Sequence, residues 1–226
     1  MVECFQKEGG MLDKFIGDAI MAGFGIPVPH DDDVDRAVRA TIAMMKSLRT
    51  WNVERAAEGK PAVDIGIGLN TDSIVSGNIG SKKRMDYTMI GDGVNLASRL
   101  ESACKQYGAL ILVSEFTVRA LKGTYRMREL DLVVVKGKTK PVAIYEIVDY
   151  HTEETYPQLP DALGHFRDGL ARYRKRDWQA ARAQFEKVLA INASDKAAKL
   201  YLERCDLLES NPPADDWTGV WVMQSK

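Results

Sequence analysis

The tripeptide Ile-Gly-Asp occurs twice, at 16–18 and at 90–92, and the two copies are followed by different patterns. The first copy joins the short apolar segments "MLDKF" and "AIMAGFG", which predicts a β-hairpin with Asp18 at its turn. The second copy leads into "GVNLASRLESACKQYG", where apolar residues share one helical face and Gly108 can end the helix. One chain therefore uses this turn both to close a hairpin and to start a helix, which predicts an α+β fold.

The rest of the first two thirds of the chain alternates between helical and extended patterns. An Asp-rich start precedes apolar residues at helical spacing: Val34, Val38, Thr41, Met45 and Leu48. The segments "AVDIGIGLN" and "SIVSGNIG" are predicted to form neighbouring strands. Further on, "ALILVS" predicts a buried strand, 114–123 a short helix, and "LDLVVVKGKTKPVAIYEIV" two strands joined by a basic loop. The whole pattern predicts an α+β sandwich with helices packed against a mixed sheet.

The pattern becomes purely helical toward the C-terminus. The segment "TYPQLP" predicts a linker over 151–160, and 161–210 is helical in period. Small and aromatic residues in "GLARYRKRDWQAARAQFEKVLAINASD" are spaced as in a tetratricopeptide unit. Because about three such units are needed for an independent solenoid, we expect this small all-α unit to dock on the first domain or on a partner chain. In the tail over 211–226, Trp217 and Trp221 are expected to pack onto another surface.

The composition limits the partners and the compartment. Lys and Arg total 31 against 32 Asp and Glu, so the net charge is -1 and no overall positive field attracts nucleic acid. The three cysteines are far apart and lack metal-ligand spacing, which predicts a reducing compartment without disulfides. No apolar run approaches the roughly 20 residues of a membrane helix. We therefore expect a cytoplasmic protein, although segments upstream of this chain could attach the parent protein to a membrane.

Three blocks of the sequence closely resemble the catalytic domain of class III nucleotidyl cyclases: "LDKFIGDAIMAGFG", "GIGLNTDSIVSGNIGSKKRMDYTMIGDGVNLASRLES" and "VVVKGKTKPVAIYEIV". The resemblance covers about residues 1–150 and implies a ferredoxin-like mixed sheet with helices. It also implies an adenylate cyclase, in which the ribose 3'-hydroxyl of ATP attacks the α-phosphorus and pyrophosphate leaves. The helical unit and the tail are similar to the C-terminal extension of some bacterial members of the family.

The resemblance implies one metal ligand and two base-reading residues. Asp18 matches the second metal aspartate of a site for two Mg²⁺ or Mn²⁺ ions, although an aspartate in a tight turn can also serve backbone geometry alone. Lys14 matches the base-reading lysine, which can only donate hydrogen bonds and suits N1 of adenine. Thr88 matches the companion position, whose oxygen can accept from the adenine N6 amine. Without the family context, a solvated lysine and a strand-end threonine would explain these two residues equally well.

Three further residues match positions that act on the ribose and the phosphates. Asn95 and Arg99 are four apart, so they share one face of the predicted helix. In the family these residues orient the ribose and stabilise charge in the transition state. The alternatives are a capping asparagine and a surface arginine paired with Glu101 or Asp92. Lys136 matches a phosphate-binding lysine, with a solvated loop charge as the alternative.

The chain departs from the family pattern at its start, "MVECFQKEGG". Class III domains resemble one another in an initial strand that carries the first metal aspartate, and no residue here matches that aspartate. The chain is then a fragment, a shortened form, or a gene model begun at an internal methionine. We expect the chain by itself to make little cyclic AMP, and an in-frame upstream strand with the missing aspartate would favour a cyclase.

The resemblance also implies a homodimer with shared active sites, since family sites lie between two protomers and this chain carries residues of both halves. The competing hypothesis is a non-catalytic dimerisation or interaction module, because a sheet without its first strand leaves an unpaired edge and a thinner core. A regulatory protein or an upstream sensor domain is a further partner that the resemblance allows.

Overall fold

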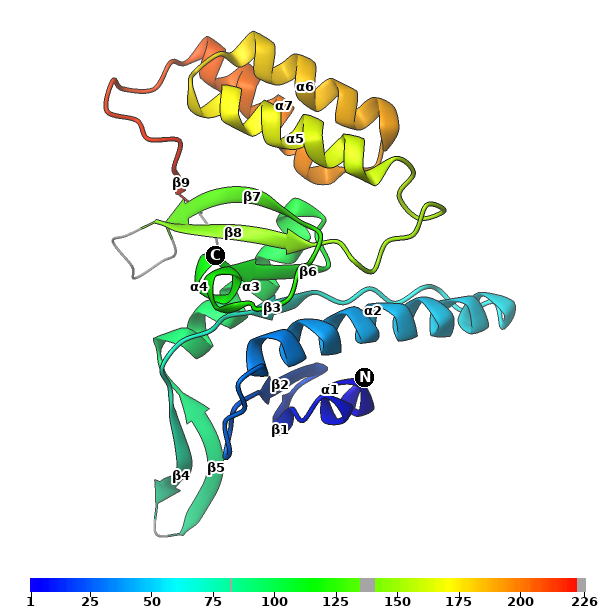
Figure 1. The fold of residues 1–226 in the computed structure, drawn as a ribbon, viewed down its shortest axis with the longest axis vertical. Coiled ribbons are helices and arrows are strands. Elements are labelled where there is room, and N and C mark those ends of the chain that lie inside the picture. The colour runs from blue at the N-terminus through cyan, green and yellow to red at the C-terminus, as the bar shows by residue number, and fades with distance from the viewer. Residues whose placement is uncertain (82, 135–140, 223–226) are drawn as a thin grey trace.

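A computed structural model of the chain describes residues 1–81, 83–134 and 141–222. Figure 1 shows an elongated molecule with a helical unit at one end and a two-stranded arm at the other. Across the described ranges, no helix is long and apolar enough to cross a bilayer. The helices are α1 (Val2–Lys7), α2 (Asp33–Ala57), α3 (Asp92–Tyr107), α4 (Glu115–Ala120), α5 (Leu159–Arg174), α6 (Trp178–Ile191) and α7 (Lys196–Ser210). The strands are β1 (Met11–Ile16), β2 (Ala19–Gly23), β3 (Ile67–Leu69), β4 (Val75–Ser81), β5 (Arg84–Ile90), β6 (Ile111–Ser114), β7 (Met127–Val134), β8 (Val142–Ile147) and β9 (Trp221–Val222).

The central sheet has the strand order β3-β6-β8-β7-β9. β3 runs parallel to β6 and β9 parallel to β7, whereas β8 is antiparallel to both β6 and β7. The predicted mixed sheet is therefore confirmed. β6 is buried over its whole length, which is typical of a strand covered on both faces.

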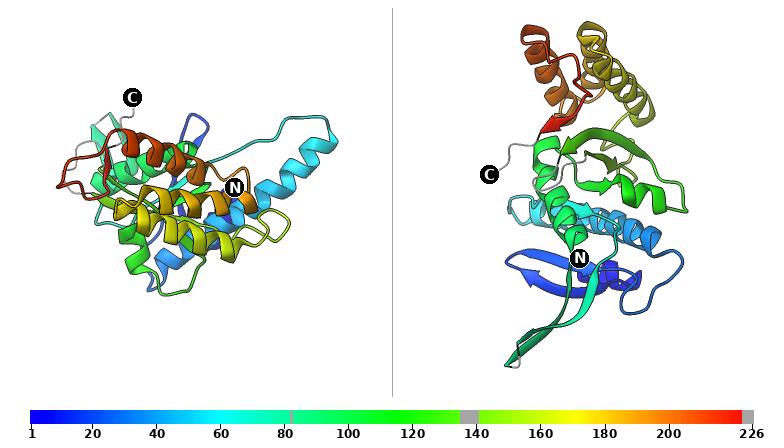
Figure 2. Two further views of the ribbon diagram at one scale, coloured as in Figure 1. Left: turned by 90° about the horizontal axis from the view of Figure 1, so that it is seen from above. Right: turned by 90° about the vertical axis from the view of Figure 1, so that its left-hand side faces the viewer.

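Helices cover both faces of the central sheet, and alternate residues of β6 face them. Ile111 and Val113 belong to one core cluster with Val38 and Met45 of α2. Leu112 belongs to a larger cluster that includes α3, α5, α6 and α7. Because side chains alternate along a strand, one short strand contributes to both cores. Figure 2 shows the resulting layers, with the helical unit, the sheet, α2 and the hairpin of β1 and β2 in succession.

Two hairpins lie outside the central sheet. β1 pairs with β2 around Gly17, whose φ of 63° is readily adopted by glycine and closes the predicted turn. Asp18 lies exposed at this turn. β4 pairs with β5 to form the arm that projects from the body in Figure 1.

The prediction that the segments 62–70 and 73–80 form neighbouring strands is wrong. β3 pairs with β6, and β4 pairs only with β5 in the described part of the chain. Alternating hydrophobicity identifies a strand but not its partner. Between the two strands, the Asn70 side chain donates to the carbonyl of Gly93 in α3 and accepts from Ser114, so the chain is held to neighbouring elements as it leaves the sheet.

The helical unit, formed by α5, α6 and α7, docks on the first domain. This is one of the two arrangements that the sequence predicted, the other being docking on a partner chain. The Tyr201 hydroxyl of α7 donates to the carbonyl of Leu130 in β7 at 2.7 Å. Within the unit, the rings of Phe185 and Tyr201 stack with centroids 5.0 Å apart, and Phe166 meets both edge-on. The unit shares one core with the sheet. Its tetratricopeptide-like character and the domain limits stay predictions.

Both tail tryptophans pack onto another surface, as predicted. The Trp217 ring lies edge-on to the rings of Tyr173 and Trp178, with centroids 5.5 and 5.6 Å away. Trp221 lies in β9, and the Arg204 guanidinium is 4.2 Å from its ring centroid. The tail therefore continues the sheet beyond β7 and covers part of the helical unit.

A buried ion-pair network joins the sheet to the start of α7. Asp195 accepts hydrogen bonds from Arg128 of β7 at 2.6 Å and from the Tyr156 hydroxyl at 2.7 Å. Arg128 also donates to Glu146 of β8 at 2.8 Å. Burial acts to raise the pKa of Asp195, but the charge and hydrogen bond of Arg128 outweigh it and hold that pKa below its usual value.

A second buried carboxylate joins three elements. Asp131 of β7 accepts from Arg204 of α7 at 2.6 Å and from the Tyr107 hydroxyl of α3 at 2.6 Å. All three side chains are buried. The C-terminal end of α3 is thereby fixed to the sheet and to the helical unit.

Candidate active site

The hairpin of β1 and β2 presents two predicted site residues to solvent. Lys14 lies in β1 with its side chain 43% exposed, and Asp18 lies exposed at the turn. The positive φ of Gly17 keeps this turn tight, so the ammonium and the carboxylate lie on one short hairpin.

An irregularity in β1 brings Lys14 and Thr88 to the same carboxylate. The register between β1 and β2 shifts between Leu12 and Lys14, so Asp13 is the extra residue of a β-bulge. The Asp13 side chain is fully buried, and its Oδ2 accepts a hydrogen bond from Thr88 Oγ1 of β5 at 2.9 Å. The Lys14 Nζ lies 3.8 Å from the same Oδ2. The two predicted base-reading residues, far apart in the sequence, therefore meet in space.

Asp13 is the residue that sequence reasoning missed. It stands in a short strand, where regular alternation gives the direction of each side chain, and a bulge breaks that alternation without a local sequence signal. Its only signal is adjacency to Lys14. A carboxylate beside a predicted ligand-binding lysine is common on surfaces, so adjacency alone does not distinguish a buried partner from a solvated one.

Helix α3 carries Asn95 and Arg99 directly after β5. Gly91 joins the strand to the helix with a φ of 152°, a value that favours glycine. Leu96 and Leu100 face the core, whereas Asn95 is exposed and Arg99 is half-buried. The predicted helix and the predicted spacing are confirmed. Among the described residues, no hydrogen bond or ion pair joins either side chain to the hairpin turn.

Lys136 lies within 135–140, outside the described residues, so its role stays a prediction. The strands on either side of it are the predicted ones, β7 and β8.

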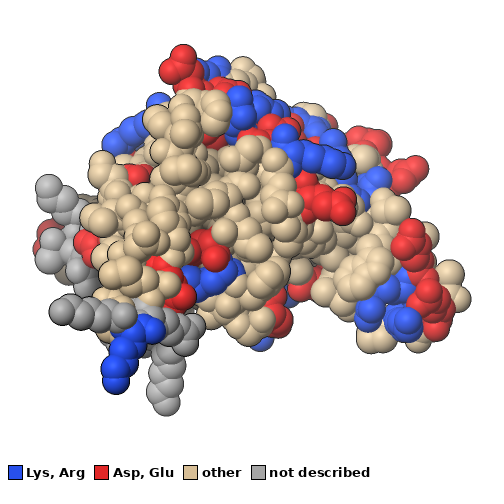
Figure 3. Space-filling model, turned by 90° about the horizontal axis from the view of Figure 1, so that it is seen from below, with Lys and Arg blue, Asp and Glu red and all other residues tan. Residues whose placement is uncertain are grey.

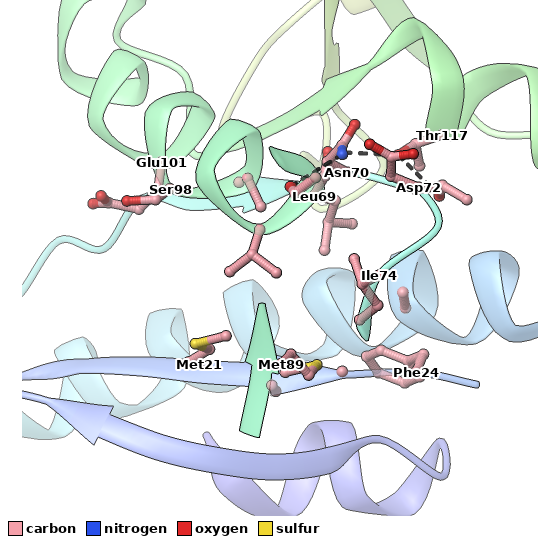
Figure 4. Close-up of a pocket in the computed structure, with 18 of the residues that line it drawn as sticks. Met21, Phe24, Leu69, Asn70, Asp72, Ile74, Met89, Ser98, Glu101 and Thr117 are labelled. Carbon is pink, nitrogen blue, oxygen red and sulfur yellow. Dashed lines mark hydrogen bonds between the residues drawn. The ribbon is translucent and has the colours of Figure 1, made fainter. Parts of the chain in front are cut away.

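A cavity of about 600 Å³ lies between the β1–β2 hairpin and the central sheet. Figure 4 shows apolar side chains around it, among them Met21, Phe24, Leu69, Ile74 and Met89. β2 and β3 border the cavity, and each of these strands is paired on one side only within the described ranges. Of the predicted site residues, Asn95 lines this cavity, whereas Lys14 and Asp18 do not. Three carboxylates, those of Asp33, Asp72 and Glu101, also line the cavity. This gap between two sheet edges, largely apolar and otherwise acidic, is therefore unsuited as a whole to a triphosphate.

The described residues do not complete a metal site around Asp18. Within these ranges, no group of three or more His, Cys, Asp and Glu side chains lies close enough together to hold a metal ion. Mg²⁺ prefers several oxygen ligands in octahedral geometry. Asp18 supplies one carboxylate, and further ligands would have to come from outside the described residues.

The sequence profile described as "Adenylate and Guanylate cyclase catalytic domain" matches residues 5–150. The "Adenylate cyclase" of Anabaena cylindrica is 41% identical over 154 residues, which are 65% of this chain and 30% of that protein. The "Adenylate cyclase, terminal-differentiation specific" of Dictyostelium discoideum is 37% identical over 204 residues, which are 87% of this chain and 9% of that protein. The chain thus spans less than a third of the length of these relatives.

A solved cyclase structure is also similar to this chain in fold. The crystal structure of the adenylyl cyclase CyaB from P. aeruginosa matches with a TM-score of 0.60 and 39% identity, over 66% of this chain and 76% of that one. The profile ends at residue 150, whereas the Dictyostelium match covers 87% of the chain, so that similarity continues into the helical unit.

Proposed function

Because the chain belongs to the class III adenylate and guanylate cyclase catalytic domain family, we propose that it is the catalytic domain of an adenylate cyclase, which converts ATP to 3',5'-cyclic AMP and pyrophosphate. The observation that carries this proposal is the meeting of Lys14 and Thr88 at one buried carboxylate. Family membership does not choose the base, since the profile covers both adenylate and guanylate cyclases. The choice rests on these side chains.

The chemistry of Lys14 and Thr88 favours adenine. An ammonium group only donates hydrogen bonds, so Lys14 suits the bare N1 of adenine and not the N1–H of guanine. The Thr88 oxygen can accept from the N6 amine of adenine. A site that hydrogen-bonds one base leaves polar groups unpaired with the other, which costs about 1 to 3 kcal/mol per contact.

Asn95 and Arg99 are proposed to act on the ribose and on the reacting phosphate. Their place on the outer side of α3 gives a fixed amide and a guanidinium fork on a helix that is packed into the core. Such a preorganised cation stabilises the negative charge that develops as the 3'-hydroxyl attacks the α-phosphorus.

The proposal includes two Mg²⁺ or Mn²⁺ ions per intact site. Bound there, such ions would lower the pKa of the ribose hydroxyl and neutralise the triphosphate. Asp18 is the residue of this chain that would hold them, since it is an exposed carboxylate at a tight turn. Because the described ranges contain no group of three or more candidate ligand side chains, we assign no further metal ligand from them.

We also propose a homodimer in which Asp18 of one chain faces Lys14, Thr88, Asn95 and Arg99 of the other. Large apolar side chains stand exposed on the β1–β2 hairpin and on the arm: Phe15, Ile16, Val75, Met85, Tyr87 and Ile90. Figure 3 shows a broad region without charged side chains on the face seen from below, toward which the arm of Figure 1 projects. Burying an apolar surface of this kind favours association, and a twofold arrangement would give two equivalent sites.

A non-catalytic dimerisation or interaction module is the second candidate. The lack of a three-ligand metal group among the described residues and the cavity between β2 and β3 favour it. It would use the same exposed apolar surfaces, but it assigns no role to the convergence of Lys14 and Thr88.

Cyclic nucleotide formation from ATP and from GTP, with Mg²⁺ and with Mn²⁺, tests the proposal. The assay uses this chain and a longer natural form that includes upstream sequence. We expect cyclic AMP from the longer form and little from this chain, since a lost transition-state charge interaction costs about 3 kcal/mol, or roughly a hundredfold in rate. Comparable GTP turnover would contradict the base assignment. No product and no nucleotide binding from either form would favour the non-catalytic module.

A further inference from the structure

Asp13 is a buried carboxylate that the reaction itself does not use. Its side chain is fully buried, one oxygen accepts from Thr88 at 2.9 Å, and the Lys14 ammonium lies 3.8 Å from that same oxygen. The other oxygen, Oδ1, is also buried and has no hydrogen-bond partner among the described residues. A buried acceptor without a donor is uncommon in folded proteins.

The contact with Asp13 decides which hydrogen bonds Thr88 can make with a base. A hydroxyl carries one proton and can donate or accept, so a threonine alone does not distinguish an amine from a carbonyl. An ionised carboxylate can only accept, and the hydrogen bond runs from Thr88 Oγ1 to Asp13 Oδ2. The proton of Thr88 is therefore committed to Asp13. The remaining lone pairs of Thr88 Oγ1 can only accept.

We propose that Asp13 is a positioning residue that makes this site select a base with an amino group at C6. This inference rests on the proposed adenylate cyclase function and deepens it. With the Thr88 proton held by Asp13, an arriving base meets an acceptor at Thr88 Oγ1. The 6-amino group of adenine can donate to this oxygen, whereas the O6 of guanine or hypoxanthine is a further acceptor and cannot.

The fold holds this arrangement in place. The β-bulge turns Asp13 out of the regular alternation of β1 and toward β5. Thr88 is itself only 8% exposed, so water competes weakly for its hydroxyl. The selectivity of the site therefore depends on the packing of one hairpin against the base of the arm.

Replacing Asp13 by asparagine tests the inference with almost no change of shape. The amide of Asp13→Asn can donate to Thr88 Oγ1, which frees the threonine proton to donate to O6. We expect the ratio of kcat/KM for ATP to kcat/KM for GTP to fall about tenfold or more, with a parallel fall against inosine triphosphate. Inosine triphosphate has O6 but lacks the 2-amino group of guanine, so it isolates the effect at position 6. Dissociation constants of unreactive ATP and GTP analogues give a second readout.

Two further variants separate selection from a loss of structure. Asp64→Asn removes a carboxylate at an exposed position and is expected to leave the ratio unchanged. Thr88→Val removes the hydroxyl at similar volume, so the ratio should fall, and adding Asp13→Asn to it should change the ratio no further. Thermal unfolding of each variant confirms that the folded protein is compared.

The outcomes distinguish this inference from the proposed function. A wild-type protein that prefers ATP, together with an Asp13→Asn variant that keeps the same ratio or loses activity equally on all three nucleotides, overturns the role of Asp13 alone. A further fall in the ratio when Asp13→Asn is added to Thr88→Val also overturns it. A wild-type protein that neither binds nor converts any nucleotide overturns the proposed function, and the inference with it.

Discussion

The helical core, defined as the central sheet with α3, α5, α6 and α7, and the hairpin region, defined as β1–β2 and β4–β5, are built differently. One continuous cluster runs through the helical core from Leu96 to Leu208. The hairpin region instead exposes large apolar side chains such as Phe15 and Met85, and a cavity separates the β1–β2 hairpin from the sheet. The helical core therefore supplies most of the stability, whereas the hairpin region carries Lys14, Asp18 and Thr88 of the predicted site.

Helix α3 of the helical core connects the two regions, since it directly follows β5. Its C-terminal end is fixed through Tyr107 to Asp131 and Arg204, and its N-terminal end carries Asn95 and lines the cavity. We therefore expect that stability and activity can be changed separately, except at α3, where packing and site geometry are coupled.

Breaking the buried ion pair of the helical core should have the largest effect. Arg128→Ala leaves Glu146 and Asp195 buried without their cation, so we expect the free energy of unfolding to fall by about 3 to 5 kcal/mol. Chemical denaturation measures the loss. The matched control is Arg182→Ala, which breaks pairs with the exposed Asp206 and Glu209 and should cost less than about 1 kcal/mol. Equal losses of stability in Arg128→Ala and Arg182→Ala would show that Arg128 does not join the sheet to the start of α7 as described.

Splitting the predicted site between two chains should affect activity alone. Asp18→Ala and Arg99→Ala in separate longer natural forms should each reduce cyclic AMP formation about a hundredfold or more, a loss of about 3 kcal/mol in transition-state stabilisation. Mixing the two variants should restore part of the activity, because a mixed dimer has both lesions in one site and an intact second site. Unchanged unfolding and dimer formation are the controls. Absence of recovery between two folded, dimeric variants would contradict the shared site.

Substitution at the contact of α3 with β3 should change both stability and activity. A Cβ at Gly68 would meet the Ala97 carbonyl oxygen at 2.1 Å and the Glu101 nitrogen at 2.4 Å, so Gly68→Ala must displace α3. We expect a loss of about 1 to 3 kcal/mol in stability together with lower activity, because Asn95 and Arg99 move with the helix. Gly77→Ala in β4, where a Cβ would meet no atom within 4 Å, is the control for both measurements. Unaltered activity in a destabilised Gly68→Ala protein would show that the activity does not depend on the position of α3.

A histidine where the sheet meets the helical unit should make stability depend on pH without affecting the site. Burial, together with the charges of Arg128 and Arg126, lowers the pKa of His151 to about 4. Between the unfolded value near 6.5 and 4, the unfolded chain binds a proton that the folded chain does not, so the free energy of unfolding falls as pH falls through this window. After allowance for partial solvent exposure, the change is on the order of 1 to 2 kcal/mol. His151→Gln should flatten that slope in denaturation at pH 7, 6, 5 and 4.5, and a variant with the wild-type slope would rule out this histidine as its cause.

The sequence by itself determined the elements and much of the candidate site. The Gly-Asp turn predicted the hairpin with Asp18, and helical spacing placed Asn95 and Arg99 on one face of a helix that ends at Gly108 with a φ of 66°. These features depend on turn chemistry and on side-chain periods, which act over a few residues. The family resemblance of the three blocks was likewise readable from the sequence.

The tertiary structure alone decided which segments meet. It pairs β4 with β5 rather than with β3, turns Asp13 inward at a bulge so that Lys14 and Thr88 share one carboxylate, and docks α7 through Asp195 on the sheet. Strand partners, bulges and buried ion pairs are selected by the free energy of packing between residues far apart in the chain. A local pattern carries no information about that free energy, because the same strand or helix is compatible with many partners.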